Sequence, residues 1–238
     1  MNKVYIIFKK ELQSYFNSAI AYIFLAIFLI FSGWLFFQNF FVINQASIRG
    51  FFGIMPWMLL FLVPAITMRS WAEEKRNGTI ELLLTFPVRD WEVVLAKYLS
   101  SLVFIIIALV LSLGIPITAS ALGNLDWGPV VGGYFGILFL ASCYLALGLY
   151  ISSLTKNQIV AFLMTIIACF TAFILSDGIV INSMGIFFGS ILNNLGLSSH
   201  FGNLSRGVLD LRDIIYFIIF TIFFLFLNIQ SLNSRNWK

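Results

Sequence analysis

The chain has 238 residues, of which 61% are hydrophobic and 10% are charged, and its formal net charge is +4. Soluble globular chains are about 45–50% apolar and about 25% charged. The composition therefore excludes a soluble enzyme, a nucleic-acid-binding domain, a disordered chain and a disulfide scaffold. It indicates an integral membrane protein whose lysines and arginines collect on one side of a bilayer.

Residues 1–18 are too polar to cross a membrane, and they predict a helix that lies in its interface. On a helical wheel the large apolar side chains share one broad face, while Lys10 lies with other lysines on the opposite face. Glu11 falls inside the apolar arc, where a carboxylate needs a partner or access to water. Two interpretations follow. Either Glu11 reaches water, or it pairs with a cation of residues 69–97 and ties the helix to that loop.

Six segments are apolar and long enough, or nearly so, to cross a bilayer, which takes about 20 residues. They are residues 19–43, 51–68, 98–122, 129–154, 158–181 and 214–232. No internal repeat or linker separates them. The pattern predicts an all-α polytopic protein with six transmembrane helices, forming a single membrane domain over residues 1–238.

The lysines and arginines predict the orientation of the six spans, because cytoplasmic loops carry an excess of both. Eleven of the fourteen lie in the termini and in the loops after the second and fourth spans, and three lie in the alternate loops. Both termini and residues 69–97 are therefore expected in the cytoplasm. The second span is expected to continue as a helix through Arg76 and to end at Gly78, since glycine is favoured just past a helix end.

A short apolar helix is predicted between this end and the third span. Thr79 suits its N-cap, with Glu81 in the first turn, Pro87 ends it, and Asp90 is expected to cap the next helix. Its large apolar side chains are Ile80, Leu82, Leu83, Leu84 and Phe86. An exposed apolar patch of this kind is typical of a protein interface. The alternative is that the helix packs against the protein's own interface helix.

The stretch after the fifth span, residues 182–213, is too polar and too interrupted to cross a membrane, and it predicts short re-entrant or surface helices on the far side. A cluster of charged side chains precedes the sixth span: Arg206, Asp210, Arg212 and Asp213. Their spacing predicts a shared helix face, and the alternative is a solvated start of the sixth span. The single histidine, His200, is expected at the surface of this loop, and one histidine is too few for a metal motif of two histidines.

One stretch of the sequence resembles a known family. Residues 74–87 read Glu-Lys-Arg-Asn-Gly-Thr-Ile-Glu-Leu-Leu-Leu-Thr-Phe-Pro and are followed by Lys97. This pattern resembles the permease subunits of ABC-2-type transporters, with Ala96 where the family has glycine. Lys10-Glu11-Leu12 resembles the interface helix of the family. Residues 64–70 and 205–213 resemble the branch that contains gliding-motility-associated permeases.

The resemblance implies a mechanism in which two permease chains, identical or related, form the membrane pathway above two separate P-loop ATPase subunits. A coupling helix of about residues 79–86 would carry the motion of the ATPase to the membrane. Leu82, Leu83 and Phe86 would fill a groove on the ATPase. Glu74 and Glu81 would make polar contacts at its edge, Gly78 would set the turn, and Thr79 and Pro87 would bound the helix.

The resemblance further implies an exporter in a bacterial inner membrane, with an extracytoplasmic accessory subunit as a further partner. The chain has no phosphate-binding G-x-x-x-x-G-K-[ST] run, so ATP and Mg are expected on the partner ATPase and no cofactor or metal on this chain. Neither an enzymatic activity of its own nor a nucleic-acid partner is expected. Two alternatives stay open at this point: a carrier or channel outside the ABC class, and a membrane scaffold subunit without transport.

Overall fold

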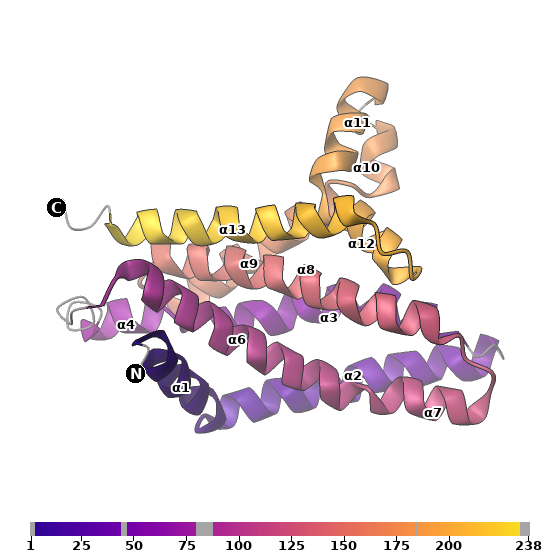
Figure 1. Cartoon of the computed structure of the whole chain (residues 1–238), viewed down its shortest axis with the longest axis horizontal. Helices are drawn as coiled ribbons and strands as arrows, with labels where there is room; N and C mark the ends of the chain where they lie inside the picture. The colour runs from indigo at the N-terminus through magenta and orange to yellow at the C-terminus, as the bar shows by residue number, and fades with distance from the viewer. Residues whose placement is uncertain (1–2, 44–46, 80–87, 184, 234–238) are drawn as a thin grey trace.

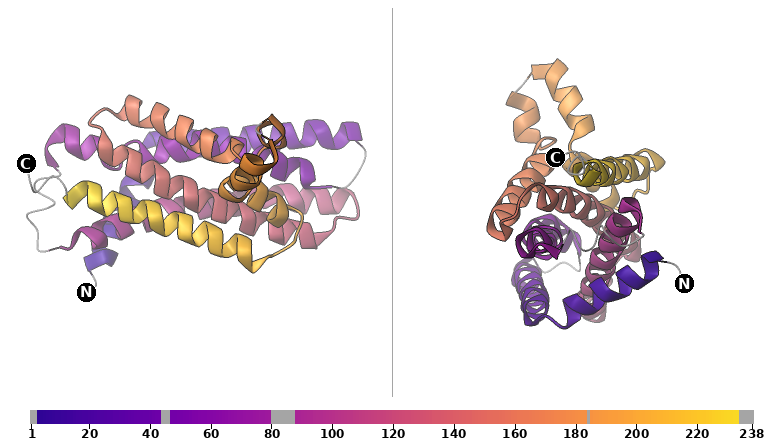
Figure 2. Two further views of the ribbon diagram at one scale, coloured as in Figure 1. Left: turned by 90° about the horizontal axis from the view of Figure 1, so that it is seen from above. Right: turned by 90° about the vertical axis from the view of Figure 1, so that its left-hand side faces the viewer.

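The computed structural model describes residues 3–43, 47–79, 88–183 and 185–233. Regular structure in these residues is helical (Figure 1). The helices are α1 (Lys3–Phe16), α2 (Ala19–Ile43), α3 (Arg49–Thr67), α4 (Ala72–Asn77), α6 (Asp90–Ser112), α7 (Gly114–Leu122), α8 (Trp127–Leu154), α9 (Gln158–Ile174), α10 (Gly178–Ser183), α11 (Gly185–Leu195), α12 (Leu197–Ser205) and α13 (Leu211–Asn233). The long helices run up and down a bundle, and both termini lie at the end that also holds α4 (Figures 1 and 2).

Five helical stretches of the described residues are long and apolar enough to cross a membrane. They are Ala21–Val42, Arg49–Asn77, Asp90–Leu122, Trp127–Leu154 and Leu211–Asn233. Each matches a predicted span. The remaining predicted span, residues 158–181, contains α9, which has 17 residues and is shorter than the other five. The prediction of an all-helical membrane bundle is thus confirmed, with five helical stretches long and apolar enough to cross the membrane.

The second and third predicted spans are not single helices, which corrects the sequence-based expectation. Helix α3 ends at Thr67, a turn follows, and α4 begins at Ala72, so the second span does not run unbroken through Arg76. The third span divides at Leu113 into α6 and α7. Pro116 explains that division, because it has no N–H to continue the helical hydrogen-bond ladder.

Helix α8 forms the centre of the bundle and packs against α3, α6, α9, α12 and α13. Small residues allow these contacts to be close. A Cβ built on Gly132 would lie 2.7 Å from Cα of Gly207, and one on Gly136 would lie 2.9 Å from Cβ of Leu204. The backbone of α8 therefore touches α12 and the turn that follows it, with no room for a side chain between them.

The outer faces of the bundle are apolar, as a membrane requires. Trp34 of α2, Ile167 of α9 and Ile219 of α13 are each about 60% exposed. A soluble protein seldom exposes many large apolar side chains over long helices. These faces are therefore the surfaces that meet lipid tails or other membrane subunits.

Helices α10 and α11 pack on each other and project from the side of the bundle, while α12 returns to α8 (Figure 1). Three successive carbonyls at the end of α11 accept hydrogen bonds from the helices that follow. Asn193 O accepts from Ser199 Oγ at 2.6 Å, Asn194 O bonds His200 Nε2 at 3.2 Å, and Leu195 O accepts from the Tyr216 hydroxyl. Such side-chain bonds satisfy carbonyls that a helix end leaves unpaired, and they fix the hairpin to α12 and α13.

Candidate functional site

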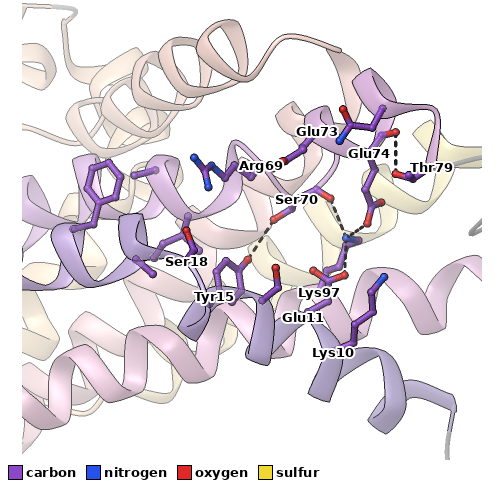
Figure 3. Close-up of a pocket in the computed structure, with 16 residues that line it drawn as sticks. Lys10, Glu11, Tyr15, Ser18, Arg69, Ser70, Glu73, Glu74, Thr79 and Lys97 are labelled. Atoms are coloured by element: carbon purple, nitrogen blue, oxygen red, sulfur yellow. Dashed lines mark hydrogen bonds and ion pairs between the residues drawn. The ribbon is translucent and has the colours of Figure 1, made fainter.

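A buried lysine joins three helices at the end of the bundle that holds both termini. Lys97, in the second turn of α6, has a side chain that is 1% exposed. Its Nζ donates to Glu11 Oε1 of α1 at 3.1 Å, to Glu74 Oε1 of α4 at 2.7 Å, and to the backbone carbonyl of Ser70 at 2.9 Å (Figure 3). An ammonium has three donors, and here each one has an acceptor from a different segment.

The stability of this junction depends on the mutual compensation of its charges. Lys97 Nζ also lies 4.9 Å from the centre of the Trp71 ring, which adds a cation–π contact. Removing one partner of a buried ion pair costs about 3–5 kcal/mol, because the other charge is left uncompensated in a low-dielectric site. Glu11 therefore has the ion pair that one interpretation of the sequence assigned to it, and Lys97 is its cation.

The turn between α3 and α4 is held in place by α8. Ser152 Oγ accepts from the backbone N–H groups of Trp71 and Ala72, each at 3.2 Å, and donates to the carbonyl of Met68 at 3.3 Å. All three backbone groups belong to the break in the helix, where the regular ladder cannot satisfy them. A single hydroxyl from α8 thus stabilises the turn that brings Glu74 to Lys97.

Tyr15 of α1 makes a second link between the same elements. Its hydroxyl bonds Ser101 Oγ of α6 at 2.9 Å and Ser70 Oγ at 3.4 Å (Figure 3). Burial raises the pKa of the Tyr15 phenol above its ordinary value, although the hydrogen bonds from both serines act in the opposite direction. The phenol is therefore a neutral hydrogen-bonding group, and its ring packs against Phe104 with centroids 5.7 Å apart.

Helix α4 ends before the predicted coupling segment, and helix α6 begins after it. Gly78 ends α4 with a φ of 71°, and its N–H and the Thr79 hydroxyl both donate to the carbonyl of Glu74. Beyond the segment, Glu92 accepts the backbone N–H of Arg89 at 2.9 Å. The residue that precedes α6 is thus Arg89, and the expectation that Asp90 caps this helix is wrong by one position, since Asp90 is its first residue.

The other residues assigned to coupling lie outside the described residues. These are Glu81, Leu82, Leu83, Phe86 and Pro87. Their roles stay predictions.

A cavity of about 360 Å³ opens beside the junction, among α1, α2, α3, α4 and α6. Lys10 and Glu11 line it from α1, and Arg69, Glu73 and Glu74 line it from the turn after α3 and from α4 (Figure 3). Both interface-helix residues singled out in the sequence therefore face this region. Among the described residues, no three His, Cys, Asp or Glu side chains gather in a way that could hold a metal ion.

The far-side charged residues do not form the shared helix face that their spacing predicts. Helix α12 ends at Ser205, and Arg206 and Asp210 are exposed in the turn before α13. Asp210 accepts the backbone N–H of Arg212 at 2.9 Å and so supports the start of α13. Asp213 is 2% exposed and faces inward. The turn between the two helices breaks the i,i+4 register on which the expectation rested.

Asp213 pairs instead with His200, which corrects the expectation that His200 lies at the surface. His200 is 8% exposed, and its Nδ1 lies 2.6 Å from Asp213 Oδ1, while Asn203 donates to Oδ2 at 3.0 Å. Its Nε2 faces the carbonyl of Asn194, and its ring stacks on Tyr216 with centroids 4.0 Å apart. The pair therefore fixes the far-side helices together.

The sequence does not identify the centre of the junction. Lys97 is one of several cations in residues 69–97 and is the lysine of the family pattern, and no sequence feature assigns a role to Tyr15 or Ser152. One signal was present: a lysine at the edge of a long apolar span is costly in a membrane and is seldom without function. Ser152 had no comparable signal, because serine is common where membrane helices pack.

A comparison with known protein families gave a match that covers most of this bundle. A family model described as ABC-2 family transporter protein matches residues 37–230, from the end of α2 to the end of α13. A comparison with curated proteins gave no match. The matched region includes Lys97, Glu74 and the whole predicted coupling segment between α4 and α6. The chain therefore belongs to the ABC-2 family of transporter proteins.

Proposed function

We propose that the chain is the permease subunit of an ATP-driven exporter, and that a separate P-loop ATPase docks on residues 79–86. Membership of the ABC-2 family supports the transport function. The helices that flank the segment in the chain support the docking role, because α4 ends and α6 begins at the end of the bundle that also holds both termini (Figure 1). Leu82, Leu83 and Phe86 would enter a groove on the ATPase, with Glu81 at its edge.

One observation carries this proposal: the Lys97 junction connects both sides of the docking segment to the rest of the bundle. Glu74 lies on α4, before the segment, and Lys97 lies on α6, after it, and Glu74 Oε1 and Lys97 Nζ are 2.7 Å apart. Glu11 ties α1 to the same ammonium. A displacement of the segment would therefore move α4, α6 and α1 together, and α6 continues into the membrane.

The proposed arrangement has six membrane crossings, with both termini in the cytoplasm. Helix α8 ends, and α9 begins, at the end of the bundle that holds the termini, whereas α13 starts farther along the bundle (Figure 1). In this arrangement the chain would return along α9. At about 1.5 Å per residue the 17 residues of α9 span about 26 Å, close to the hydrocarbon thickness of about 30 Å.

The proposal includes a second permease chain, identical or related, and two copies of the ATPase, located in a bacterial inner membrane. ATP and Mg would be bound by the ATPase. The resemblance of residues 64–70 and 205–213 favours a gliding-motility-associated system with an extracytoplasmic accessory subunit. In this proposal, helices α10 to α12 and the turn with Arg206 and Asp210 would form the surface that such a subunit contacts.

Purification of the tagged chain in mild detergent, with quantitative mass spectrometry of its partners, tests the proposal. We expect a P-loop ATPase at a one-to-one ratio with the permease. Leu83→Glu should remove it, because a charge would be buried in an apolar groove. Lys156→Glu is the matched control, since it adds negative charge to an exposed residue of the loop at the same end of the bundle. A wild-type chain that purifies without an ATPase in several detergents, or a Leu83→Glu variant that retains it, would contradict the proposal.

A further inference from the structure

The cavity beside Lys97 has an apolar part and a polar part. Its apolar lining comes from the membrane helices, with Ala21 and Phe24 on α2 and Ala65 and Ile66 on α3. Its polar lining comes from α1, from the turn after α3, from α4 and from the start of α6. Its volume of about 360 Å³ lies within the range of small-molecule pockets, about 300–1,000 Å³. A ligand that fits both ends must itself be amphipathic.

Two residues that line this cavity each have one buried side-chain atom with no hydrogen-bond partner among the described residues. One is the donor Nε of Arg69 and the other is the acceptor Oε2 of Glu74. Buried polar groups are nearly always paired, because an unpaired one has lost its hydrogen bonds to water without a replacement. In Figure 3, Arg69 lies on the side of Ser18, near the start of α2, and the Glu74 carboxylate lies beside Lys97. The cavity is thus lined by a cationic donor on the side of α2 and by an acceptor on the side of α4 and α6.

The charges around the cavity are balanced overall but separated in space. Lys97 compensates one of the two carboxylates that it contacts, so Glu11 and Glu74 together keep one negative charge. Glu73 adds a second negative charge, while Arg69 and Lys10 each add a positive one. A purely anionic ligand would meet repulsion from the acidic side, and a purely cationic ligand would meet repulsion from Arg69. A ligand with both charges fits.

We propose that this cavity binds the headgroup of a zwitterionic phospholipid that carries a primary ammonium. Arg69 donates to its phosphate, Glu74 accepts from its ammonium, and one acyl chain runs between α2 and α3. The order of groups along the cavity, from apolar lining to Arg69 to Glu74, matches the order of acyl chain, phosphate and ammonium in phosphatidylethanolamine. The bound lipid fills the space between the interface helix and the turn after α3.

This proposal does not depend on the ATPase. It concerns the isolated permease, so its test is carried out on the tagged chain alone, and failure of one proposal is distinguishable from failure of the other.

Native mass spectrometry of the purified full-length chain tests the proposal directly. The protein is mixed with equal amounts of phosphatidylethanolamine, phosphatidylcholine and phosphatidylglycerol that carry the same acyl chains. We expect phosphatidylethanolamine to be retained about tenfold more than phosphatidylcholine, because the trimethylated headgroup has no N–H to donate to Glu74 and a hydrogen bond to a charged group is among the stronger ones. This comparison needs no variant.

Two variants then separate the contacts. Arg69→Gln should lower retention of all three lipids, since their phosphates are alike, and Glu74→Gln should reduce the preference for phosphatidylethanolamine over phosphatidylcholine. Arg76→Gln is the matched control, because Arg76 is exposed on α4 and does not line the cavity. It should retain lipid as the wild type does.

Three results would overturn the proposal. The first is equal retention of phosphatidylethanolamine and phosphatidylcholine by the wild-type chain, and the second is undiminished lipid retention by Arg69→Gln. The third concerns the source of the headgroup: if soluble glycerophosphoethanolamine at the same concentration displaced the lipid completely, the site would recognise a solute and not a membrane lipid. We expect it to displace little, because it lacks the acyl chain that contacts α2 and α3.

Discussion

Lys97 of α6 and Glu11 of α1, 86 residues apart in the chain, form a buried ion pair with Nζ and Oε1 at 3.1 Å. The pair ties a helix outside the five long spans to one of those spans. With Glu74 as a second carboxylate, it forms the only three-helix ion-pair junction within the described residues. It joins the two helices that flank the proposed docking segment in the chain.

Replacing the lysine of this junction should destabilise the protein strongly. In Lys97→Met the carboxylates of Glu11 and Glu74 stay close together without a cation, and we expect a loss of about 3–5 kcal/mol in the free energy of unfolding. Unfolding in mixed micelles measures it. Lys9→Met serves as the control, because Lys9 is exposed on α1. A Lys97→Met variant as stable as this control would show that the junction contributes nothing to stability.

Loss of one carboxylate should be milder than loss of the lysine. In Glu11→Gln, Lys97 keeps Glu74 and the Ser70 carbonyl, so its charge stays compensated. We expect a smaller destabilisation than in Lys97→Met and greater susceptibility of α1 to proteolysis, since its ion pair to α6 is gone. Limited proteolysis with N-terminal sequencing checks this. An α1 that resists cleavage as in the wild type would contradict the tie between α1 and α6.

Ser152 should matter more than most serines in this chain. Ser152→Ala leaves the buried N–H groups of Trp71 and Ala72 without their acceptor, at a cost of about 1–3 kcal/mol for each unsatisfied group. The comparison is Ser120→Ala, because the Ser120 hydroxyl bonds a carbonyl of its own helix, that of Ile117. We expect a lower free energy of unfolding in the first variant alone. Equal effects would show that the turn does not depend on α8.

Close helix packing predicts a clear difference between two glycines. In Gly132→Ala the new methyl would lie 2.7 Å from Cα of Gly207 and 3.0 Å from the Leu204 carbonyl, both backbone atoms that cannot move aside. Overpacking of this kind costs about 1–3 kcal/mol. Gly53→Ala, with nothing within 4 Å of its new methyl, should be neutral or slightly stabilising. Unfolding of both variants in mixed micelles provides the test, and equal stability would refute the close contact.

The far-side residues give a prediction that reverses the one from sequence alone. Asp213→Asn removes the carboxylate that holds His200 and Asn203 and should loosen α12 against α13. Arg206→Gln changes an exposed residue and should have little effect. Hydrogen–deuterium exchange of residues 185–205 distinguishes the two. Faster exchange in Arg206→Gln than in Asp213→Asn would contradict this prediction and favour the shared helix face that the sequence predicts.

The long helices could be predicted because apolar runs and membrane thickness together determine them. Helix α2 has the predicted bounds of residues 19–43. Helix α9 ends before the predicted residue 181 for a tertiary reason: the backbone N–H of Ser199 bonds Ser176 Oγ just after the helix, and Gly196 packs against the same serine. No pattern in the sequence near residue 176 predicts such a contact.

For the site, the sequence predicts that Glu11 needs a partner but not which residue provides it. The apolar arc around Glu11 indicated that a carboxylate there needed a cation, yet several cations of residues 69–97 were available, and the fold selects Lys97. The break between α3 and α4 depends on Ser152, which lies on another helix. His200 and Asp213 meet because α12 and α13 pack together across a turn. In each case the missing information is which helices are neighbours, which composition and periodicity do not contain.

The most direct test of the central claim asks whether α1, α4 and α6 move as one unit during ATP turnover. Nitroxide labels on Lys9→Cys and Arg76→Cys, both exposed positions, report the separation of α1 and α4 by electron paramagnetic resonance, and the native cysteines are buried. In the complex with its ATPase we predict the same narrow distance distribution with and without ATP and vanadate, and a broader one in Lys97→Gln. A separation that changes with nucleotide in the wild-type chain as much as in Lys97→Gln would contradict the account.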